Sequence, residues 1–76
     1  FAAQVLACLR AWGLAGDDLR VNAKGGGISM GHPLGMTGAR IAAAAARRLN
    51  EGGGKSALAT LCVGVGQGVA LALHRP

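Results

Sequence analysis

Aromatic and acidic residues are scarce in this 76-residue chain. It has one Phe, one Trp and no Tyr, and its three acidic residues stand against eight basic ones. The apolar fraction of 51% therefore consists mostly of Ala, Leu and Val, and it excludes a disordered chain. A domain of this length buries only about 60% of the surface that its unfolded chain exposes, so its core is thin.

Long apolar runs are also missing. The longest strictly apolar run, residues 41–46, is far shorter than the ~20 residues of a membrane span. The 14 glycines follow no three-residue period, which excludes a collagen-like chain. The sequence opens on Phe1 without Met and without a signal-peptide pattern. We expect a fragment that starts inside a helix.

The number of cysteines and the net charge narrow the class of protein further. Two cysteines, Cys8 and Cys62, are too few for a disulfide framework, so we expect a cytoplasmic protein. The net charge of +5 raises the possibility of nucleic-acid binding. However, the basic residues are scattered, and no aromatic residues alternate with them to stack on bases. A nucleic-acid module is therefore only the third alternative, and we expect neither a nucleic-acid nor a membrane partner.

Periodicity predicts the helices. Apolar residues recur at three- and four-residue spacing over residues 1–12, which predicts a helix that Gly13 or Gly16 ends. Residues 19–23 alternate loosely and could form a short strand, and residues 25–35 read as a Gly-rich loop. A second helix is expected from Pro33 or Thr37 to Asn50, stopped by the glycines at 52–54. Its Ala-rich centre has no polar face, which predicts burial between two layers that this chain alone cannot supply.

The last third of the chain predicts a β-hairpin. Residues 56–63 form a continuous apolar run that fits a strand buried on both faces. Residues 64–68 turn the chain, and residues 69–73 read as a second strand. The order helix, loop, helix, strand, strand predicts one piece of an α/β protein, without an internal repeat or linker.

His32 is the first candidate site residue. Three glycines precede it, and Pro33 follows, so backbone could approach a ligand closely there. If a helix begins at Pro33, His32 stands at its positive end, which favours a neutral ring able to accept a proton or donate a hydrogen bond. A histidine packed structurally at a helix start is an equal alternative.

Cys62 is the second candidate. It lies at the end of a predicted strand, and such strand ends carry reactive groups in many α/β proteins. The backbone N–H of Gly64 could donate to an oxyanion. Taken alone, a buried and inert cysteine is the more frequent alternative for Cys62, and Cys8 is assigned to that class.

No phosphate-binding or metal-binding motif has the residue spacing that such a site requires. The glycines of residues 64–68 are too closely spaced for a dinucleotide loop, and no Gly-Lys-Ser/Thr sequence is present. A zinc site built from His32, Cys62 and His74 would lack any close ligand pair. We therefore expect no metal.

Two long motifs together resemble those of the thiolase family. Residues 21–40, VNAKGGGISMGHPLGMTGAR, resemble the thiolase pattern VNxNGGAIxxGHPxGxSGAR. Residues 58–68, LATLCVGVGQG, resemble the closing motif LATxCxGxGQG, and the opening FAAQ looks like the end of the NEAFAAQ segment. The resemblance covers essentially the whole chain, in order and at the expected spacing. It implies a C-terminal thiolase domain over residues 1–76, with a layered α/β fold that buries helices between two sheets.

The resemblance also implies a reaction and the roles of individual residues in it. Thiolases transfer acetyl groups between an enzyme cysteine and coenzyme A, and they make or cleave 3-oxoacyl-CoA by Claisen chemistry without a further cofactor. His32 matches the histidine that helps to activate the nucleophile and faces a thioester oxygen. Cys62 matches the acid/base cysteine, and Gly64 matches an oxyanion-hole glycine. Phe1 matches a residue of the pantetheine channel. Acyl-CoA partners, the remainder of a thiolase chain and a homo-oligomeric full-length form follow from the same resemblance.

The chain also departs from the family pattern. Lys24 replaces the usual Asn, Gly27 replaces Ala and Thr37 replaces Ser. Val65, in place of the more frequent Gly, resembles the subgroup that acts on 3-oxoadipyl-CoA in the breakdown of aromatic compounds. The nucleophilic cysteine and the Asn of the NEAF segment are absent from these residues. We therefore predict that the isolated chain is inactive, and the alternative is a non-catalytic thiolase-like protein or degenerate remnant.

Overall fold

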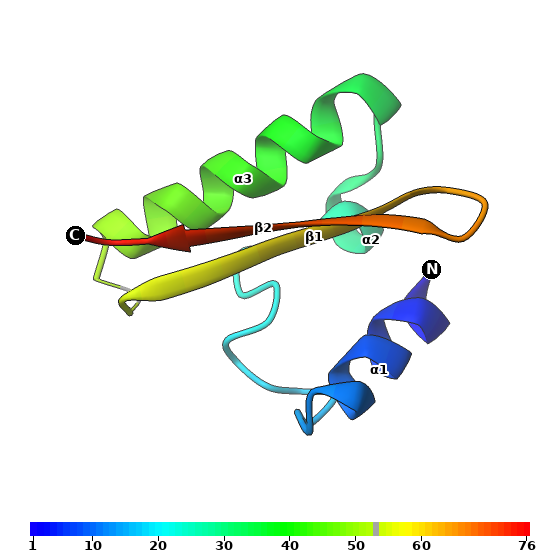
Figure 1. The fold of residues 1–76 in the computed structure, drawn as a ribbon, viewed down its shortest axis with the longest axis horizontal. Coiled ribbons are helices and arrows are strands. Elements are labelled where there is room, and N and C mark those ends of the chain that lie inside the picture. The colour runs from blue at the N-terminus through cyan, green and yellow to red at the C-terminus, as the bar shows by residue number, and fades with distance from the viewer. Residues whose placement is uncertain (53) are drawn as a thin grey trace. The chain divides into compact units, whose positions relative to one another are not determined.

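The computed structural model describes residues 1–52 and 54–76. Two compact units divide the chain, Phe1–His32 and Pro33–Pro76. Helices α1 (Ala2–Ala11) and α2 (Gly27–Met30) belong to the first unit. The second unit contains helix α3 (Leu34–Asn50) and strands β1 (Ser56–Gly64) and β2 (Gln67–His74), as Figure 1 shows. The expected mixture of helices and one hairpin is confirmed.

Helix α1 ends where the glycine pattern predicts. Gly13 has a φ of +70°, and its N–H donates to the Arg10 carbonyl at 3.1 Å. The Leu14 N–H reaches back to the Leu9 carbonyl at 2.8 Å. These two bonds form a Schellman motif, which pairs carbonyls that the helix end would leave open. Leu9, only 3% exposed, is the buried residue of α1.

The expected strand at residues 19–23 is wrong. The chain there makes consecutive turns. Asp18 accepts the Arg20 backbone N–H on Oδ1 at 2.9 Å, and its carbonyl accepts the Val21 N–H at 3.0 Å. Asn22 adopts a left-handed conformation with φ of +46°. Asp and Asn side chains favour turns by bonding nearby backbone, and here that local bonding prevails over the loose apolar alternation.

Asp18 and Arg20 form an ion pair with a measurable consequence. The Arg20 side chain donates to both carboxylate oxygens, at 2.9 Å from Nε and 2.6 Å from Nη2. These hydrogen bonds, from the Arg20 side chain first and then from its backbone, lower the pKa of Asp18 from 3.8 to about 2. Because the folded pKa is the lower one, the pair stabilises the turn above pH 3.8 and loses this effect as the pH falls toward about 2.

We expect Arg20→Gln to return the pKa of Asp18 toward 3.8, measured from the pH titration of its carboxyl carbon by NMR. Arg10→Gln, on α1, is the matched control and should leave that titration unchanged. An Asp18 titration that is the same with and without Arg20 would contradict the assignment of the shift to this pair.

The Gly-rich segment contains a helical turn that the sequence did not predict. In α2, the Met30 N–H donates to the Gly26 carbonyl at 2.9 Å, and the Ser29 Oγ accepts the Gly26 N–H at 3.1 Å. Gly25 has a φ of +89°, and a Cβ built there would lie 2.8 Å from the Met30 sulfur. The positive φ therefore requires glycine at this position, whereas the exposed Met30 side chain could move aside for a Cβ.

Helix α3 follows the prediction closely. Its N-cap is Pro33, and the Thr37 Oγ1 donates to the Pro33 carbonyl at 3.1 Å. Its last residue is Asn50, and Gly52 follows with a φ of +88° and donates its N–H to the Leu49 carbonyl at 3.2 Å. Part of the expected glycine stop, residue 53, lies outside the described residues.

Strands β1 and β2 form an antiparallel pair. The register runs from Ser56 opposite His74 to Cys62 opposite Gly68, and the second strand is longer than predicted. Within this unit α3 packs against the hairpin, mainly against β1 (Figure 1). Burial alternates along β1, and Ala59 is its most buried residue. Alternation of this kind is typical of a strand covered on one face.

One burial prediction fails within the described chain, and the other, for the centre of α3, stays a prediction because it requires layers from outside this chain. Leu58, next to the buried Ala59, is 52% exposed, so β1 is not covered on both faces. The Ala-rich centre of α3 is likewise exposed on one side, at Ala43, Ala44 and Ala46. Both faces are exposed because the described residues of this 44-residue unit form one helix layer and one hairpin layer, and no third layer covers them. Among residues 1–52 and 54–76, no helix combines the length and apolar character needed to cross a membrane.

Candidate functional site

His32 occupies the junction between the two units. It follows Gly31, whose φ is +91°, and immediately precedes Pro33, the N-cap of α3. Its side chain is exposed. The prediction that His32 stands just before a helix start is confirmed, since α3 begins one residue after Pro33. Gly31 and Pro33 flank His32 between the last residue of α2 and the first residue of α3.

Cys62 lies near the end of β1, at a break in the strand register. Cys62 is opposite Gly68, whereas Gly64 is opposite Gln67, so Val63 is an extra residue on β1. This is a β-bulge, a feature that bends a strand and redirects the neighbouring side chains. Cys62 is a half-buried free thiol. The predicted position of Cys62, at a strand end before a Gly-rich turn, is confirmed.

The turn after Cys62 has an unusual backbone. Gly64 has a φ of +152° and Gly66 a φ of +77°, both in regions that side chains rarely adopt. A Cβ built on either glycine would meet no atom within 4 Å, so backbone conformation, not space, requires glycine here. Between them, the Val65 side chain is 105% exposed. An apolar, β-branched side chain therefore stands fully in solvent beside the Cys62 strand end.

The other candidates lie apart from this turn. His74 is at the opposite end of the hairpin, where its Nδ1 lies 2.8 Å from the Ser56 Oγ. Cys62 lies six residues beyond Ser56 along β1, which is about 20 Å of extended chain. The structure thus separates His74 from Cys62, and the described residues contain no cluster of three or more His, Cys, Asp or Glu side chains suited to a metal. Phe1 is the N-cap of α1 and is 89% exposed.

His32 and Cys62 belong to different units, His32 at the end of the first and Cys62 in the second. Their convergence on one thioester stays a prediction. Within the second unit, Cys62, Gly64 and Val65 lie within the four consecutive residues 62–65, which form the bulge and the start of the turn.

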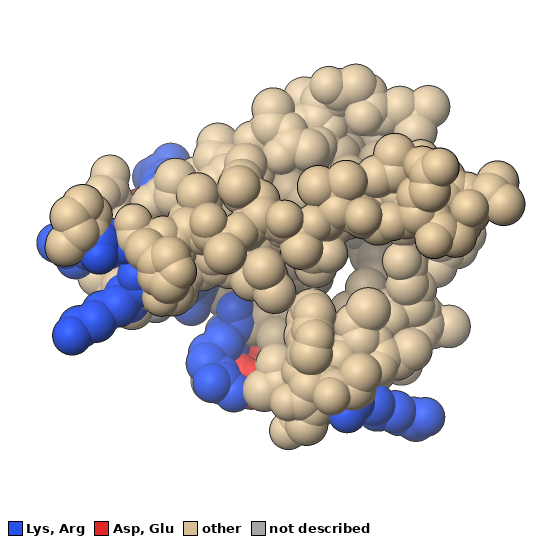
Figure 2. Space-filling view, in the orientation of Figure 1, with Lys and Arg blue, Asp and Glu red and all other residues tan. Residues whose placement is uncertain are grey.

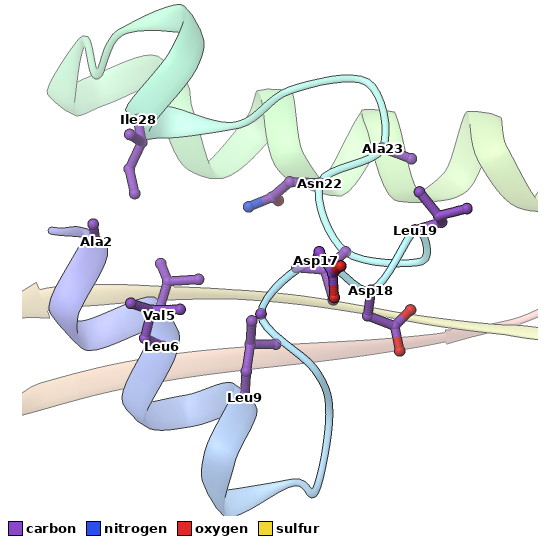
Figure 3. A pocket seen from close by; sticks show the side chains of 12 residues that line it. Ala2, Val5, Leu6, Leu9, Asp17, Asp18, Leu19, Asn22, Ala23 and Ile28 are labelled. Carbon is purple, nitrogen blue, oxygen red and sulfur yellow. The ribbon is translucent and has the colours of Figure 1, made fainter.

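A cavity in the first unit was not predicted from the sequence. Its volume is about 420 Å³, and Figure 3 shows side chains of α1 projecting toward the turn segment that contains Asp17 and Asn22. Val5, Leu6 and Leu9 form its apolar side. The three-residue and four-residue spacing of these side chains predicts an apolar face on the helix. It does not predict whether a cavity lies beside that face. None of the four predicted site residues lines this cavity.

Charged side chains are dispersed. Uncharged residues (tan) make up most of the face drawn in Figure 2. Among the described residues, Arg20 pairs with Asp18 at 2.6 Å and Arg47 pairs with Glu51 at 2.8 Å. The Glu51 carboxylate raises the pKa of Arg47 through a hydrogen bond and the Coulomb attraction. Nucleic-acid binding, the third alternative from the sequence, stays untested by these pairs.

Comparison with known proteins decides the family. A family model described as "Thiolase, C-terminal domain" matches residues 1–75. The chain belongs to the thiolase family. The resemblance of the two long motifs is thereby confirmed for the chain as a whole.

Matches to individual thiolases show how similar the chain is to them and how much of their length it covers. The chain is 57% identical over 75 residues to the beta-ketoadipyl-CoA thiolases of Acinetobacter baylyi and Pseudomonas aeruginosa. It is 55% identical to the 3-oxoadipyl-CoA/3-oxo-5,6-dehydrosuberyl-CoA thiolase of Escherichia coli. Each match covers 99% of this chain and 19% of the relative. The chain thus spans about a fifth of the length of the thiolases it matches. No solved structure gives a significant match.

Proposed function

We propose that this chain supplies the C-terminal part of an acetyl-CoA C-acyltransferase that cleaves or forms 3-oxoacyl-CoA. The observation that carries the proposal is the match of residues 1–75 to the thiolase C-terminal domain. The hairpin supports it, because Cys62 stands at a β-bulge beside a turn whose glycines have positive φ, and β-bulges are over-represented next to active sites.

The proposed roles divide the reaction among few groups. Carbon–carbon bond exchange on a thioester needs a nucleophile, a proton shuttle and stabilisation of two oxyanions. Cys62 exchanges a proton with the α-carbon of the acetyl group. His32 helps to activate the nucleophilic cysteine and faces the thioester oxygen, and the Gly64 N–H stabilises the oxyanion of the acyl-enzyme. Phe1 contributes to the pantetheine channel. The nucleophilic cysteine comes from the remainder of the thiolase chain.

The proposed substrate is a 3-oxoadipyl thioester of coenzyme A. Thiolysis by a second coenzyme A breaks the bond between the α-carbon and the 3-oxo carbon, and the acyl chain leaves two carbons shorter, as succinyl-CoA with acetyl-CoA. The relatives named for this substrate share 55–57% identity with the chain, and a relative named 3-ketoacyl-CoA thiolase, from Aliivibrio fischeri, shares 46%. Val65 within the turn supports the same subgroup.

The proposed partners explain the exposed apolar surface. Leu58 on β1 and the exposed alanines of α3 leave both outer layers of the second unit open. Exposed apolar patches often mark an interface with another part of a protein. We assign it to the remainder of a thiolase chain, with residues 1–76 as part of the C-terminal domain and α3 buried between two sheets. A cytoplasmic, homo-oligomeric enzyme that uses acyl-CoA substrates, without metal or nucleic acid, completes the proposal.

A paired assay tests this function. The 76 residues alone, incubated with 3-oxoadipyl-CoA and coenzyme A, should give no turnover above background. The same residues expressed with their upstream coding sequence should release acetyl-CoA. Turnover by the isolated chain would refute the proposed division of the site. Absence of turnover by the longer protein would favour the non-catalytic, thiolase-like alternative.

A further inference from the structure

Thr37, in the first turn of α3, is a fully buried polar residue. It is 0% exposed, whereas its neighbours Met36 and Gly38 are exposed. Threonine is mostly found at protein surfaces, and a hydroxyl that is removed from water needs a hydrogen-bond partner. The described residues of this chain provide the whole of this burial. What the hydroxyl binds therefore indicates what a buried threonine contributes at this position.

The hydroxyl donates to the Pro33 carbonyl, which accepts two further hydrogen bonds. The distance from Thr37 Oγ1 is 3.1 Å. The backbone N–H groups of Met36 and Thr37 donate to the same oxygen at 2.9 Å and 3.1 Å. The two backbone bonds are those of an ordinary helix start, whereas the hydroxyl adds a third bond from a side chain. Rotation of this carbonyl away from α3 would therefore lengthen three bonds at once.

Pro33 transmits this restraint to His32. The proline ring fixes the φ of Pro33, observed at −71°, and the orientation of its carbonyl sets its ψ, observed at 112°. The same ring limits the ψ of the preceding residue, His32, to the extended region. Each backbone torsion between the α-carbon of His32 and the start of α3 thus has a restraint of its own. The ψ of Pro33 is the torsion that the Thr37 hydroxyl restrains.

We infer that the Thr37 hydroxyl is a positioning group for His32. By holding the Pro33 carbonyl, it fixes the direction in which the backbone passes from His32 into α3. The inference rests on the proposed function in one respect, because it assigns the effect on catalysis to the role of His32 in forming the acetyl-enzyme. Thr37 is buried and bonds to backbone, so it acts through His32 and does not touch the substrate. A misplacement of about 1 Å can slow a reaction by about 10²-fold, which makes such a restraint worth having.

Two substitutions separate the hydroxyl of Thr37 from its methyl group. Thr37→Val keeps the branched shape and removes the hydroxyl, whereas Thr37→Ser keeps the hydroxyl and removes the methyl group. In Thr37→Val the two backbone N–H groups still donate to the Pro33 carbonyl, so no buried carbonyl is left without a partner and the variant should fold.

We expect Thr37→Val to slow formation of the acetyl-enzyme by about tenfold in the thiolase that contains this chain, and Thr37→Ser to stay within about twofold of the unaltered enzyme. Thr60→Val is the matched control, because the Thr60 hydroxyl also donates to a backbone carbonyl, that of Val69, at 3.1 Å. It should leave this rate unchanged. Equal losses in the two Thr37 variants, or in Thr37→Val and Thr60→Val, overturn the inference.

A double-mutant cycle with His32→Ala tests whether Thr37 acts through His32. A group that only positions His32 loses its effect when the imidazole is absent, so adding Thr37→Val to His32→Ala should cause no further loss. A second tenfold loss in the double variant overturns the inference. A wild-type rate for His32→Ala alone refutes the proposed role of His32, and the position of His32 is then decided by structure.

Crystal structures of Thr37→Val and Thr37→Ser in the same thiolase give a readout that does not depend on the reaction. In Thr37→Val the Pro33 carbonyl should rotate, and the His32 ring should shift or occupy two rotamers. In Thr37→Ser both groups should keep their places. A His32 ring that does not move in Thr37→Val overturns the inference even where turnover falls, so its failure is distinct from that of the proposed function.

Discussion

Cys62→Ala should slow carbon–carbon bond exchange by about 10²–10⁴-fold in the thiolase that contains this chain, the range that one acid/base group contributes. The physical reason is that the α-carbon of the acetyl group then has no thiol to exchange its proton with. Cys62 is suited to this role by its place, half-buried at the β-bulge before the Gly-rich turn. The measurement is steady-state turnover with 3-oxoadipyl-CoA and coenzyme A.

Partial reactions separate the proposed role of Cys62 from that of His32. Cys62→Ala should still form an acetyl-enzyme on the nucleophilic cysteine but fail to exchange the acetyl methyl protons with deuterated solvent. His32→Ala should instead slow the formation of the acetyl-enzyme. Cys8→Ala is the matched control, because Cys8 is a second half-buried thiol, on α1. Wild-type rates for both Cys62→Ala and His32→Ala would end the site assignment.

Gly64→Ala should reduce turnover by about 10²–10³-fold, the usual cost of losing one oxyanion donor. A Cβ at this position meets no atom within 4 Å, so the substitution acts through the φ of +152°, which an L-residue rarely adopts. The chain must then rotate Gly64 to another conformation and move its N–H away from the oxyanion. The readout is turnover together with the rate of acyl-enzyme formation.

Two controls isolate this backbone effect. Gly38→Ala, within α3 and also without atoms near the new Cβ, should leave turnover unchanged. D-Alanine at position 64, introduced by chemical ligation, accepts positive φ and should restore most of the activity that L-alanine loses. Equal losses with both alanine enantiomers would show that the loss does not arise from φ.

Sequence patterns were most reliable where the local chain decides the structure. Glycine at position 13 and at position 52 ends a helix because a positive φ costs glycine little, and neither end depends on distant residues. The hairpin was predictable for a similar reason, since two apolar runs flank a short Gly-rich turn. The glycines of that turn also predicted that Cys62 lies at a strand end. Family membership, too, was present in the two long motifs.

The errors share a different origin. Residues 19–23 have the apolar alternation of a strand, but Asp18 Oδ1 accepts the Arg20 backbone N–H and Asn22 has a φ of +46°, and both favour turns over an extended strand. Burial of β1 on both faces was expected from composition alone. Composition reports how apolar a strand is, whereas burial depends on what covers it, and α3 covers one face.

The sequence by itself determined the helices α1 and α3, the hairpin and the thiolase family, because propensity, glycine positions and motif spacing are local properties of the chain. Only the tertiary structure decided the extra residue on β1, the full exposure of Val65 and the exposure of Leu58 next to the buried Ala59. These features arise from register, which is set when two strands meet. A shift of one residue between the strands changes the face of every side chain without changing a letter of the sequence.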